Sequence, residues 1–174
     1  MHTIMMKPQD IVVALKLCRT GKVGRPSFAE ISSDLKMAAS EVHAAVKRCQ
    51  VAHLISPPEL GNRPNTSALL EFLIHGAKYA FPAVRGEPTR GMLTAYAAPP
   101  LDKLIVPGDE LPPVWPDSEG QSKGVAFEPL YKTVPFAAGR DPVLYEYLAL
   151  VDALRDGRVR EKKMAEHELK IRLQ

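Results

Sequence analysis

The stretch SFAEISSDLKMAASEVHAAVKRCQ, residues 27–50, decides how the N-terminal part of this 174-residue chain is expected to fold. It opens with Ser27 and Glu30, which have the spacing of a capping box, where a hydroxyl and a carboxylate accept hydrogen bonds from backbone N–H groups at a helix start. Apolar residues then recur at helical spacing and predict one buried face. They are Phe28, Ile31 and Leu35. A helix is therefore expected to begin after Ser27.

A second helix is expected after the short run Lys36–Ala39. Ser40 is a suitable N-cap for a helix from Glu41 to about Ala52. Its inward stripe consists of Val42, Ala45, Val46 and Cys49. Its opposite face carries Ser40, His43, Ala44 and Lys47, flanked by Arg48 and Gln50. Short side chains at the start and cations further along suit a helix whose first turns enter a DNA major groove while later residues meet phosphates.

A third helix precedes these two. Pro8 can occupy a first helical turn, where a missing N–H has no cost, and four apolar residues then repeat with helical period. They are Ile11, Ala14, Leu15 and Cys18. Gly21 and Gly24 are expected to end this helix. Three helices in about fifty residues, in this order, are the core with which helix-turn-helix domains hold a recognition helix.

The residues that follow predict a wing and a fourth helix. Leu54 and Ile55 can start a short strand, and ISPPELGNRP contains the turn formers of a wing, with Arg63 near its end. Asn65 is the expected N-cap of the next helix. A broad apolar face of that helix contains Leu69, Leu70, Leu73 and Ile74.

Residues 8–56 resemble the winged helix-turn-helix domains of MarR-like bacterial regulators, and AEISSDLKMAASEVHAAVKR matches their usual apolar, small and polar positions. The chain departs from the pattern at Lys36, where such proteins often carry Gly. A left-handed residue there would cost roughly 1 kcal/mol, or the turn is built differently. Two further stretches, FLIHGAKYAFPAVRGEPTRGMLTAYAAPPL and LYEYLALVDALRDGRVREKKMAEHELKIRL, are similar to bacterial proteins labelled MarR-like, some of them related to the DNA-binding antitoxins of AbiE type. This second resemblance carries no functional residues with it.

The middle of the chain is rich in proline. Fourteen of the sixteen prolines lie from Pro57 to Pro142, which excludes long helices through most of this region but leaves room for short strands. The expected strands are Lys78 to Phe81, Leu104 to Val106 and Val125 to Tyr131. Aromatic residues persist throughout, which indicates partial order, and Pro116 to Gly124 is the piece expected to be flexible.

Two helices are expected at the C-terminal end. Asp141 followed by Pro142 is a strong start signal for a helix that Gly157 ends, and RVREKKMAEHELKIRL forms the last helix. This helical pair can serve as a dimerisation element or can cover the core of its own subunit. The chain is therefore expected to be α+β in three parts. These are a winged helix-turn-helix DNA-binding domain in residues 1–76, a proline-rich α+β region with short strands in 77–140, and C-terminal helices in 141–174.

The composition limits the class of protein. A hydrophobic fraction of 45% excludes general disorder, and no run of eighteen apolar residues is present to cross a membrane. The first ten residues lack the apolar core of a signal peptide, so a cytoplasmic location is expected, in which Cys18 and Cys49 stay reduced. The net charge is only +3, but residues 1–56 carry eight Lys or Arg against four acids, so the basic excess lies in the expected DNA reader.

Other kinds of functional site have weaker signals in the sequence. A metal site at His43, Cys49 and His53 is disfavoured because neither a CxxC nor an HxxxH pair occurs. The polar stretch Thr89–Gly91, with Arg85 nearby, either cradles an anion, contacts DNA or forms a structural turn. No phosphate loop, dinucleotide fingerprint or nucleophile elbow is present, so we expect neither an enzyme nor a cofactor.

These observations predict a sequence-specific DNA-binding transcriptional regulator that acts as a repressor. The AbiE-type resemblance implies an autoregulating antitoxin of a small operon, so the expected partners are double-stranded DNA, a second copy of the chain and a toxin protein, with no membrane. Residues predicted to approach bases or phosphates are Ser40, Glu41, His43, Ala44, Lys47, Arg48, Lys36, Arg25 and Arg63. The alternative is a winged-helix adaptor or antitoxin that contacts another protein and not DNA.

Overall fold

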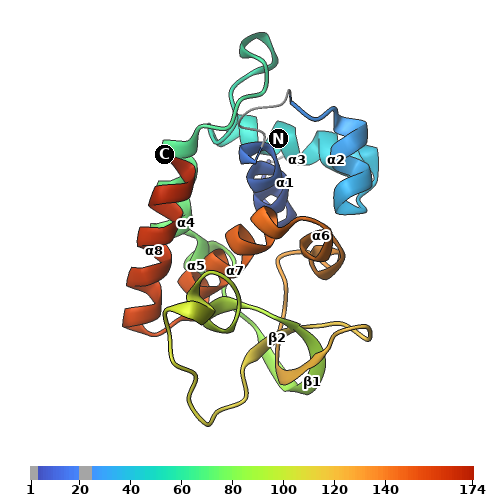
Figure 1. Ribbon diagram of the computed structural model, residues 1–174. Coiled ribbons are helices and arrows are strands. Elements are labelled where there is room, and N and C mark those ends of the chain that lie inside the picture. Colours follow the sequence, from blue (N-terminus) through green and yellow to red (C-terminus); the bar gives the residue numbers. More distant parts are fainter. Residues whose placement is uncertain (1–3, 20–24) are drawn as a thin grey trace.

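The computed structural model describes residues 4–19 and 25–174 of the chain. This part is α+β, as predicted, with eight α-helices and a small three-stranded sheet. In Figure 1 the helices α1 to α3 lie at one end of the molecule and the sheet lies at the opposite end, with α7 between them. The helices predicted to bind DNA therefore lie far from the β-strands, at the opposite end of the molecule.

The first three helices form where the sequence pattern placed them. They are α1 (Pro8–Cys18), α2 (Phe28–Leu35) and α3 (Ala39–Val51). The capping box before α2 is confirmed, because the Glu30 N–H donates to the Ser27 hydroxyl at 3.2 Å and the Ser27 N–H donates to the Glu30 carboxylate at 2.6 Å. The prediction that Gly21 and Gly24 end α1 falls outside the described residues.

The turn between α2 and α3 has a left-handed residue, but the helix that follows it begins earlier than predicted. Lys36 adopts the left-handed conformation, with φ 52° and ψ 44°, so this turn does use the geometry that favours glycine. The prediction that Ser40 caps the second helix is wrong. Helix α3 begins at Ala39, and its N-cap is Ala38, which has no side-chain oxygen with which to accept a hydrogen bond.

A projecting loop follows α3 and contains the short 3-10 helix η1 (Pro58–Leu60). The strand expected at Leu54 and Ile55 is reduced to a single antiparallel bridge between Ile55 and Pro64. The Ser56 N–H donates to the Arg63 carbonyl at 2.7 Å and closes the base of the loop. Two prolines in succession limit the ladder, as proline lacks the N–H that a strand donates.

Helix α4 (Thr66–His75) then begins at its predicted N-cap. The Ala68 N–H donates to the Asn65 side chain at 3.1 Å. The strand predicted for Lys78 to Phe81 is wrong, because this segment forms the short helix α5 (Ala77–Ala80). Gly76 keeps a helical conformation, with φ −111° and ψ −34°, and so lets the chain turn from α4 directly into α5.

The sheet consists of β1 (Arg85–Leu93), β2 (Pro113–Pro116) and β3 (Ser122–Phe127). Strand β1 pairs antiparallel with both other strands, and β2 pairs parallel with β3, so the three strands close on one another. The segment between β1 and β2 holds two 3-10 helices, η2 (Ala95–Ala97) and η3 (Leu101–Lys103).

Glycines make this closure possible. A Cβ atom on Gly91 would lie 2.0 Å from the Trp115 carbonyl oxygen, and one on Gly124 would lie 2.1 Å from the Pro112 carbonyl oxygen. Both distances are far below van der Waals contact. Backbones therefore approach one another here in a way that no larger residue permits.

The other strands and the turn predicted for the middle region are only partly present in the structure. Residues Leu104 to Val106 form no strand, and of Val125 to Tyr131 only the portion up to Phe127 belongs to β3. Thr89, Arg90 and Gly91 lie within β1, so the prediction of a turn there is wrong.

The C-terminal helices are α6 (Val134–Arg140), α7 (Pro142–Asp156) and α8 (Val159–Leu173). Asp141 caps α7 as predicted, because its carboxylate accepts from the Leu144 N–H at 3.1 Å. Helix α8 lies along α4 and α7 with Leu169 and Leu173 buried, so it covers the core of its own subunit (Figure 1). Dimerisation through this pair stays a prediction.

One contiguous set of buried apolar side chains runs from α1 to α8. Each of the three predicted segments, 1–76, 77–140 and 141–174, contributes to it. A polar network joins α1 and α2 to the N-cap of α7. The Lys16 ammonium contacts Asp34 at 3.0 Å and Asp141 at 2.9 Å, and Asp141 also pairs with Arg19 at 3.0 Å. Within the described residues no helix combines the length and the apolar character needed to cross a bilayer.

Candidate nucleic-acid interface

Helix α3 has one buried face and one open face. Its buried face packs on α1 and α2 through the predicted stripe, Val42, Ala45, Val46 and Cys49. On the other face Ser40, His43 and Lys47 are exposed, and Ala44 is half-buried. The helix therefore presents to solvent three of the five residues that the sequence pattern assigned to base contacts, whereas Ala44 and Glu41 are half-buried.

Arg48, predicted to meet phosphate, is instead engaged within the molecule. Its Nε donates to Asp10 Oδ2 at 2.9 Å and its Nη2 donates to Asp10 Oδ1 at 2.8 Å. Nη2 also lies 2.9 Å from Glu41 Oε1. Only 13% of the Arg48 side chain is exposed and Asp10 is fully buried. Hydrogen bonding to Asp10 raises the pKa of Arg48, so this guanidinium is a charged tie between α1 and α3.

Glu41, predicted to approach base edges, belongs to the same network. Its carboxylate accepts from Gln9 Nε2 at 3.0 Å as well as from Arg48. These contacts, the Gln9 hydrogen bond first, lower the pKa of Glu41, so its negative charge persists but is balanced by Arg48. The cluster fixes how α3 sits on α1 and does not add a free anion to the open face.

His43 is held at the edge of α2. Its ring meets the Phe28 ring edge-on, with 4.5 Å between the ring centroids and an interplanar angle of 88°. This contact limits the rotation of the imidazole while leaving His43 exposed.

Lys36 lies in the turn before α3 and leans towards α6. Its ammonium stands 5.0 Å from the centroid of the Phe136 ring, within cation–π range. The Thr133 hydroxyl donates to the Leu35 carbonyl at 2.7 Å, which anchors the same turn. Lys36 is exposed, but its ammonium lies where α2 meets α6 and is not part of the open face of α3.

The loop between Ile55 and Pro64 stands out from the end of the molecule, above α3 in Figure 1. Gln50, in the last turn of α3, holds this loop by donating to the Ser56 carbonyl at 3.2 Å and to Asn62 Oδ1 at 2.7 Å. The sequence placed Gln50 only at the flank of the open face. Its position in the chain is the only sequence feature that indicates this role as the link between α3 and the loop.

Arg25 and Arg63 lie on or against this loop. The Arg25 guanidinium packs on Gly61, where an added Cβ would lie 2.5 Å from Arg25 Nη1. Gly61 also has φ +82°, a left-handed conformation that favours glycine, while the end of the Arg25 side chain is free to adjust. Arg63 is exposed at the base of the loop. The structure thus brings Arg25, distant in sequence, beside the predicted wing.

The start of α3 has unpaired backbone donors. Because Ala38 cannot cap the helix, the N–H groups of Ala39 and Ser40 have no hydrogen-bond acceptor in the described part of the chain. Helix N-termini with open N–H groups favour anions such as phosphate. These two donors lie next to the exposed Ser40 side chain.

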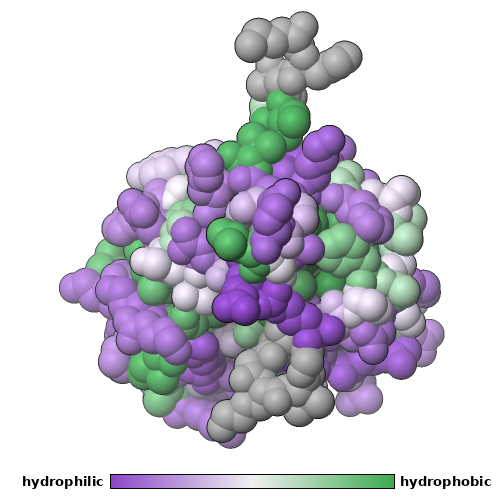
Figure 2. All heavy atoms as spheres, turned by 90° about the horizontal axis from the view of Figure 1, so that it is seen from above, coloured by the Kyte–Doolittle hydropathy of each residue, from purple (hydrophilic) through white to green (hydrophobic). Residues whose placement is uncertain are grey.

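Figure 2 views this end of the molecule from above and shows hydrophilic residues over most of the face, with scattered apolar patches. The exposed apolar side chains of this end include Met5 at 74%, Leu60 at 64% and Val51 at 52% exposure. A hollow of about 360 Å³ lies between residues 4–7 and α3; it is lined by Ile4, Met5, Lys7, Ala44, Lys47 and Arg48. Lys7 is a further cation of this surface that the sequence analysis did not select.

The two cysteines carry no reactive chemistry. Burial raises the pKa of both Cys18 and Cys49 to about 12, so both are thiols at neutral pH. Within residues 4–19 and 25–174, no three His, Cys, Asp or Glu side chains gather as a metal site would require.

A scan against protein-family models finds no match to this chain, and searches of curated proteins and of solved structures find none either.

Proposed function

We propose that this protein is a DNA-binding transcriptional regulator whose residues 1–76 act as a winged helix-turn-helix. Helix α3 enters the major groove with Ser40, His43, Ala44 and Lys47 towards base edges, and Arg25 and Arg63 meet phosphates from the loop. Lys36, in the turn just before α3, meets a flanking phosphate in this arrangement. Arg48 and Glu41 are left out of the interface because Arg48 binds Asp10 and Glu41 pairs with Arg48.

The observation that carries this proposal is the open face of α3. Ser40, His43 and Lys47 are exposed on it, while residues 4–7 border it at Ala44 and Lys47 and the Phe28 ring contacts His43. The uncapped N–H groups of Ala39 and Ser40 add donors for a phosphate at the helix start. The loop held by Gln50 places cations beside the same face.

The regulatory role follows from the sequence resemblance. Similarity to MarR-like regulators and AbiE-type antitoxins supports a cytoplasmic repressor that binds its own operator as a homodimer. In the antitoxin case a toxin protein is the second partner.

Lys47→Ala tests the interface directly. Lys47 has no ion pair or hydrogen bond in the described residues, so its loss should leave the fold intact. In a fluorescence titration with random duplex DNA at low salt, we expect weaker binding and a slope of log affinity against log salt that falls by about one. Lys163→Ala, at an exposed position of α8, is the matched control and should change neither quantity. Equal affinity and slope in the two variants would remove Lys47 from the interface.

Ala38→Ser tests the helix start. A serine at the N-cap accepts from the N–H groups of the first turn and should stabilise the protein by about 0.5–2 kcal/mol in urea denaturation. If those N–H groups bind phosphate, the same variant should bind duplex DNA less tightly despite its greater stability. A variant that is more stable and binds DNA equally well would show that the helix start does not contact DNA.

A second candidate function is protein binding by the same face. It is favoured by the exposed Met5, Val51 and Leu60, which a DNA contact does not require. The two functions separate in one titration, because a DNA binder responds to random duplex at low salt and a protein adaptor does not.

A further inference from the structure

A second polar hollow lies at the other end of the molecule, on the sheet. The loop from Asp117 to Gln121 crosses β1 there, and a Cβ on Gly120 would lie 2.4 Å from the Gly91 Cα. The Asp117 N–H donates to the Arg90 carbonyl at 3.1 Å, and the Gly120 N–H donates to the Asp117 carbonyl at 3.0 Å. The loop is thereby fixed on the strand, and beside it lies a hollow of about 590 Å³.

Two cations border this hollow. Arg90 of β1 lies directly opposite Lys123 of β3 in the antiparallel register. Both side chains are exposed, and neither has an ion pair or a hydrogen bond within the described chain. Like charges opposite one another weaken a strand pair, so an anion between or beside them would offset an unfavourable repulsion.

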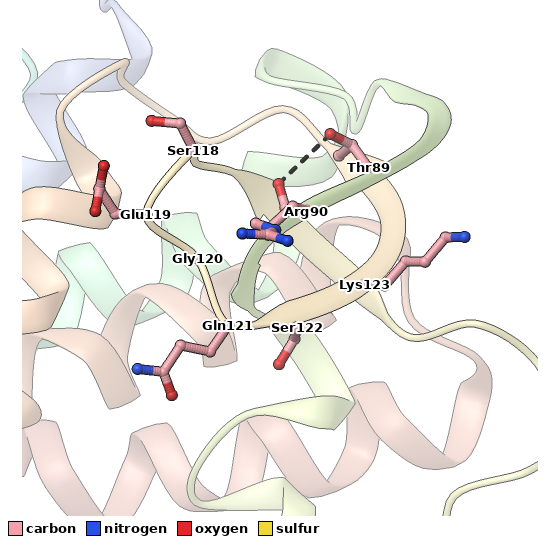
Figure 3. Close-up of a pocket in the computed structure, with 8 residues that line it drawn as sticks. All are labelled: Thr89, Arg90, Ser118, Glu119, Gly120, Gln121, Ser122 and Lys123. Atoms are coloured by element: carbon pink, nitrogen blue, oxygen red, sulfur yellow. Dashed lines mark hydrogen bonds between the residues drawn. The ribbon is translucent and has the colours of Figure 1, made fainter.

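Neutral donors line the same hollow. Ser118 and Ser122 contribute hydroxyl groups, while the Thr89 hydroxyl donates to the Arg90 carbonyl at 3.5 Å. Figure 3 shows the Arg90 side chain between the Ser118 and Ser122 positions, with the Glu119 carboxylate and the Lys123 ammonium both directed away from it on opposite sides. The N–H groups of Ser118 and Gln121 also have no acceptor in the part of the chain that the structure describes. A group with several acceptor oxygens and negative charge satisfies such a donor set.

We propose that this hollow binds a phosphate group carried by a small molecule. The sheet lies at the end of the molecule opposite to α3 (Figure 1), so a straight duplex docked on α3 does not extend to Arg90 and Lys123. A hollow of this size with charged and neutral donors along its wall suits a compact ligand. The proposal does not depend on the DNA-binding function.

Thermal unfolding of the full chain tests the site, with inorganic phosphate as the first ligand and chloride at matched ionic strength as the reference. A ligand that binds only the folded chain raises the Tm in proportion to ln(1 + [L]/Kd). We expect phosphate to raise the Tm above the chloride reference. The double variant Arg90→Gln/Lys123→Gln should weaken phosphate binding about ten-fold or more, since charge-assisted hydrogen bonds are lost.

Two further variants sharpen the result. Glu119→Gln removes the one carboxylate that lines the hollow and should strengthen phosphate binding. Lys163→Gln removes an exposed cation from α8 and should leave it unchanged. Because all four side chains are exposed, the variants are expected to fold, and amide chemical shifts of residues 118–123 provide a second readout. Loss of the phosphate effect in Lys163→Gln, or its persistence in the double variant, would overturn the proposal.

A comparison of ligands identifies the source of the phosphate. A nucleoside monophosphate should bind at least as tightly as inorganic phosphate, and the double variant should lose both. If only a single-stranded oligonucleotide raises the Tm and the monophosphate does not, the small-molecule assignment is wrong.

Discussion

The α1–α3 end and the sheet end are each held by a buried aspartate that pairs with an arginine, but the two pairs have different surroundings. Asp10 is fully buried and its partner Arg48 is 13% exposed, at the edge of the α1–α3 contact. Asp152 and Arg155 are 1% and 5% exposed, inside the contact between α7 and the sheet. The first pair therefore stays in touch with water, and the second does not.

The partners of the deeper pair come from distant parts of the chain. Asp152 accepts from the Thr94 hydroxyl and from Trp115 Nε1, each at 2.7 Å, and from Arg155 Nη1 at 2.8 Å. Arg155 Nε donates in turn to the Phe81 carbonyl at 2.7 Å. Burial raises the pKa of Asp152, and Arg155 opposes this shift. One pair therefore sets the orientation of α3, whereas the other attaches the sheet to the helical body.

Asp152→Ala is expected to have the largest effect on stability. It leaves the Arg155 guanidinium, the Trp115 indole N–H and the Thr94 hydroxyl without their acceptor in the interior. We expect the free energy of unfolding to fall by about 3–5 kcal/mol in urea denaturation. Asp156→Ala is the control on the same helix, because its ion pair with Arg85 is exposed and should be worth less than about 1 kcal/mol. Equal losses in the two variants would show that burial does not distinguish these carboxylates.

Arg48→Ala should have a smaller effect, of about 2–3 kcal/mol. Asp10 loses its paired cation but keeps the Lys7 N–H, which donates to it at 2.8 Å, and water reaches the Arg48 side of the pair. Arg158→Ala, which breaks an exposed pair with Glu110, should cost less than about 1 kcal/mol. A loss in Arg48→Ala as small as that of Arg158→Ala would contradict the role of Asp10 as a buried charge.

Glu30→Gln should have the smallest effect, and one that depends on pH. The Ser27 backbone N–H and then its hydroxyl hold the pKa of Glu30 below its ordinary value of 4.5. An acid whose pKa is lowered in the folded chain stabilises the fold above its ordinary pKa, and that contribution is lost as the pH falls through the lowered value. The stability difference between the wild type and Glu30→Gln should therefore be present at neutral pH and absent at about pH 2. Urea titrations at both pH values measure it.

The control for this pH dependence is Glu59→Gln. Glu59 is exposed on the projecting loop and has no hydrogen-bond partner among the described residues, so its substitution should give no comparable loss on acidification. A difference for Glu30→Gln that is the same at both pH values would contradict a charged capping box.

The starts of α2, α4 and α7 were predictable because their signals are local, whereas α5 was expected as a strand and α6 was not expected. Ser27 with Glu30, Asn65 and Asp141 each mark a helix start within three residues of the N–H group that they accept from. The failure at Ser40 has a local cause as well. Two adjacent small residues, Ala38 and Ala39, leave the start of α3 without a side-chain cap, and propensity alone favoured the nearby serine.

Strands β1 and β2 were not predictable from the same kind of pattern, whereas part of β3 lies within the predicted strand Val125 to Tyr131. Strand β1 has mostly exposed residues along its first half and a register shift between Arg85 and Pro88, so it lacks the alternation that marks a strand. Strand β2 both begins and ends with proline. Its pairing depends on the close approach of Gly91 to Trp115, which no local sequence rule indicates.

The candidate interface was predictable in part. The open face of α3 follows from helical periodicity, and Ser40, His43 and Lys47 are exposed as that periodicity requires. The capture of Arg48 depends on Asp10, 38 positions away in the chain. Such contacts between separate helices arise only when the tertiary fold brings them together.

The closed pairing of β1, β2 and β3 also limits how this end of the protein can associate with other chains. Each strand is hydrogen-bonded to the two others, so the sheet has no terminal strand within the described residues. Terminal strands are the usual templates for intermolecular strand addition, both in peptide recognition and in aggregation. A partner that docks on this end must therefore recognise side chains and loops.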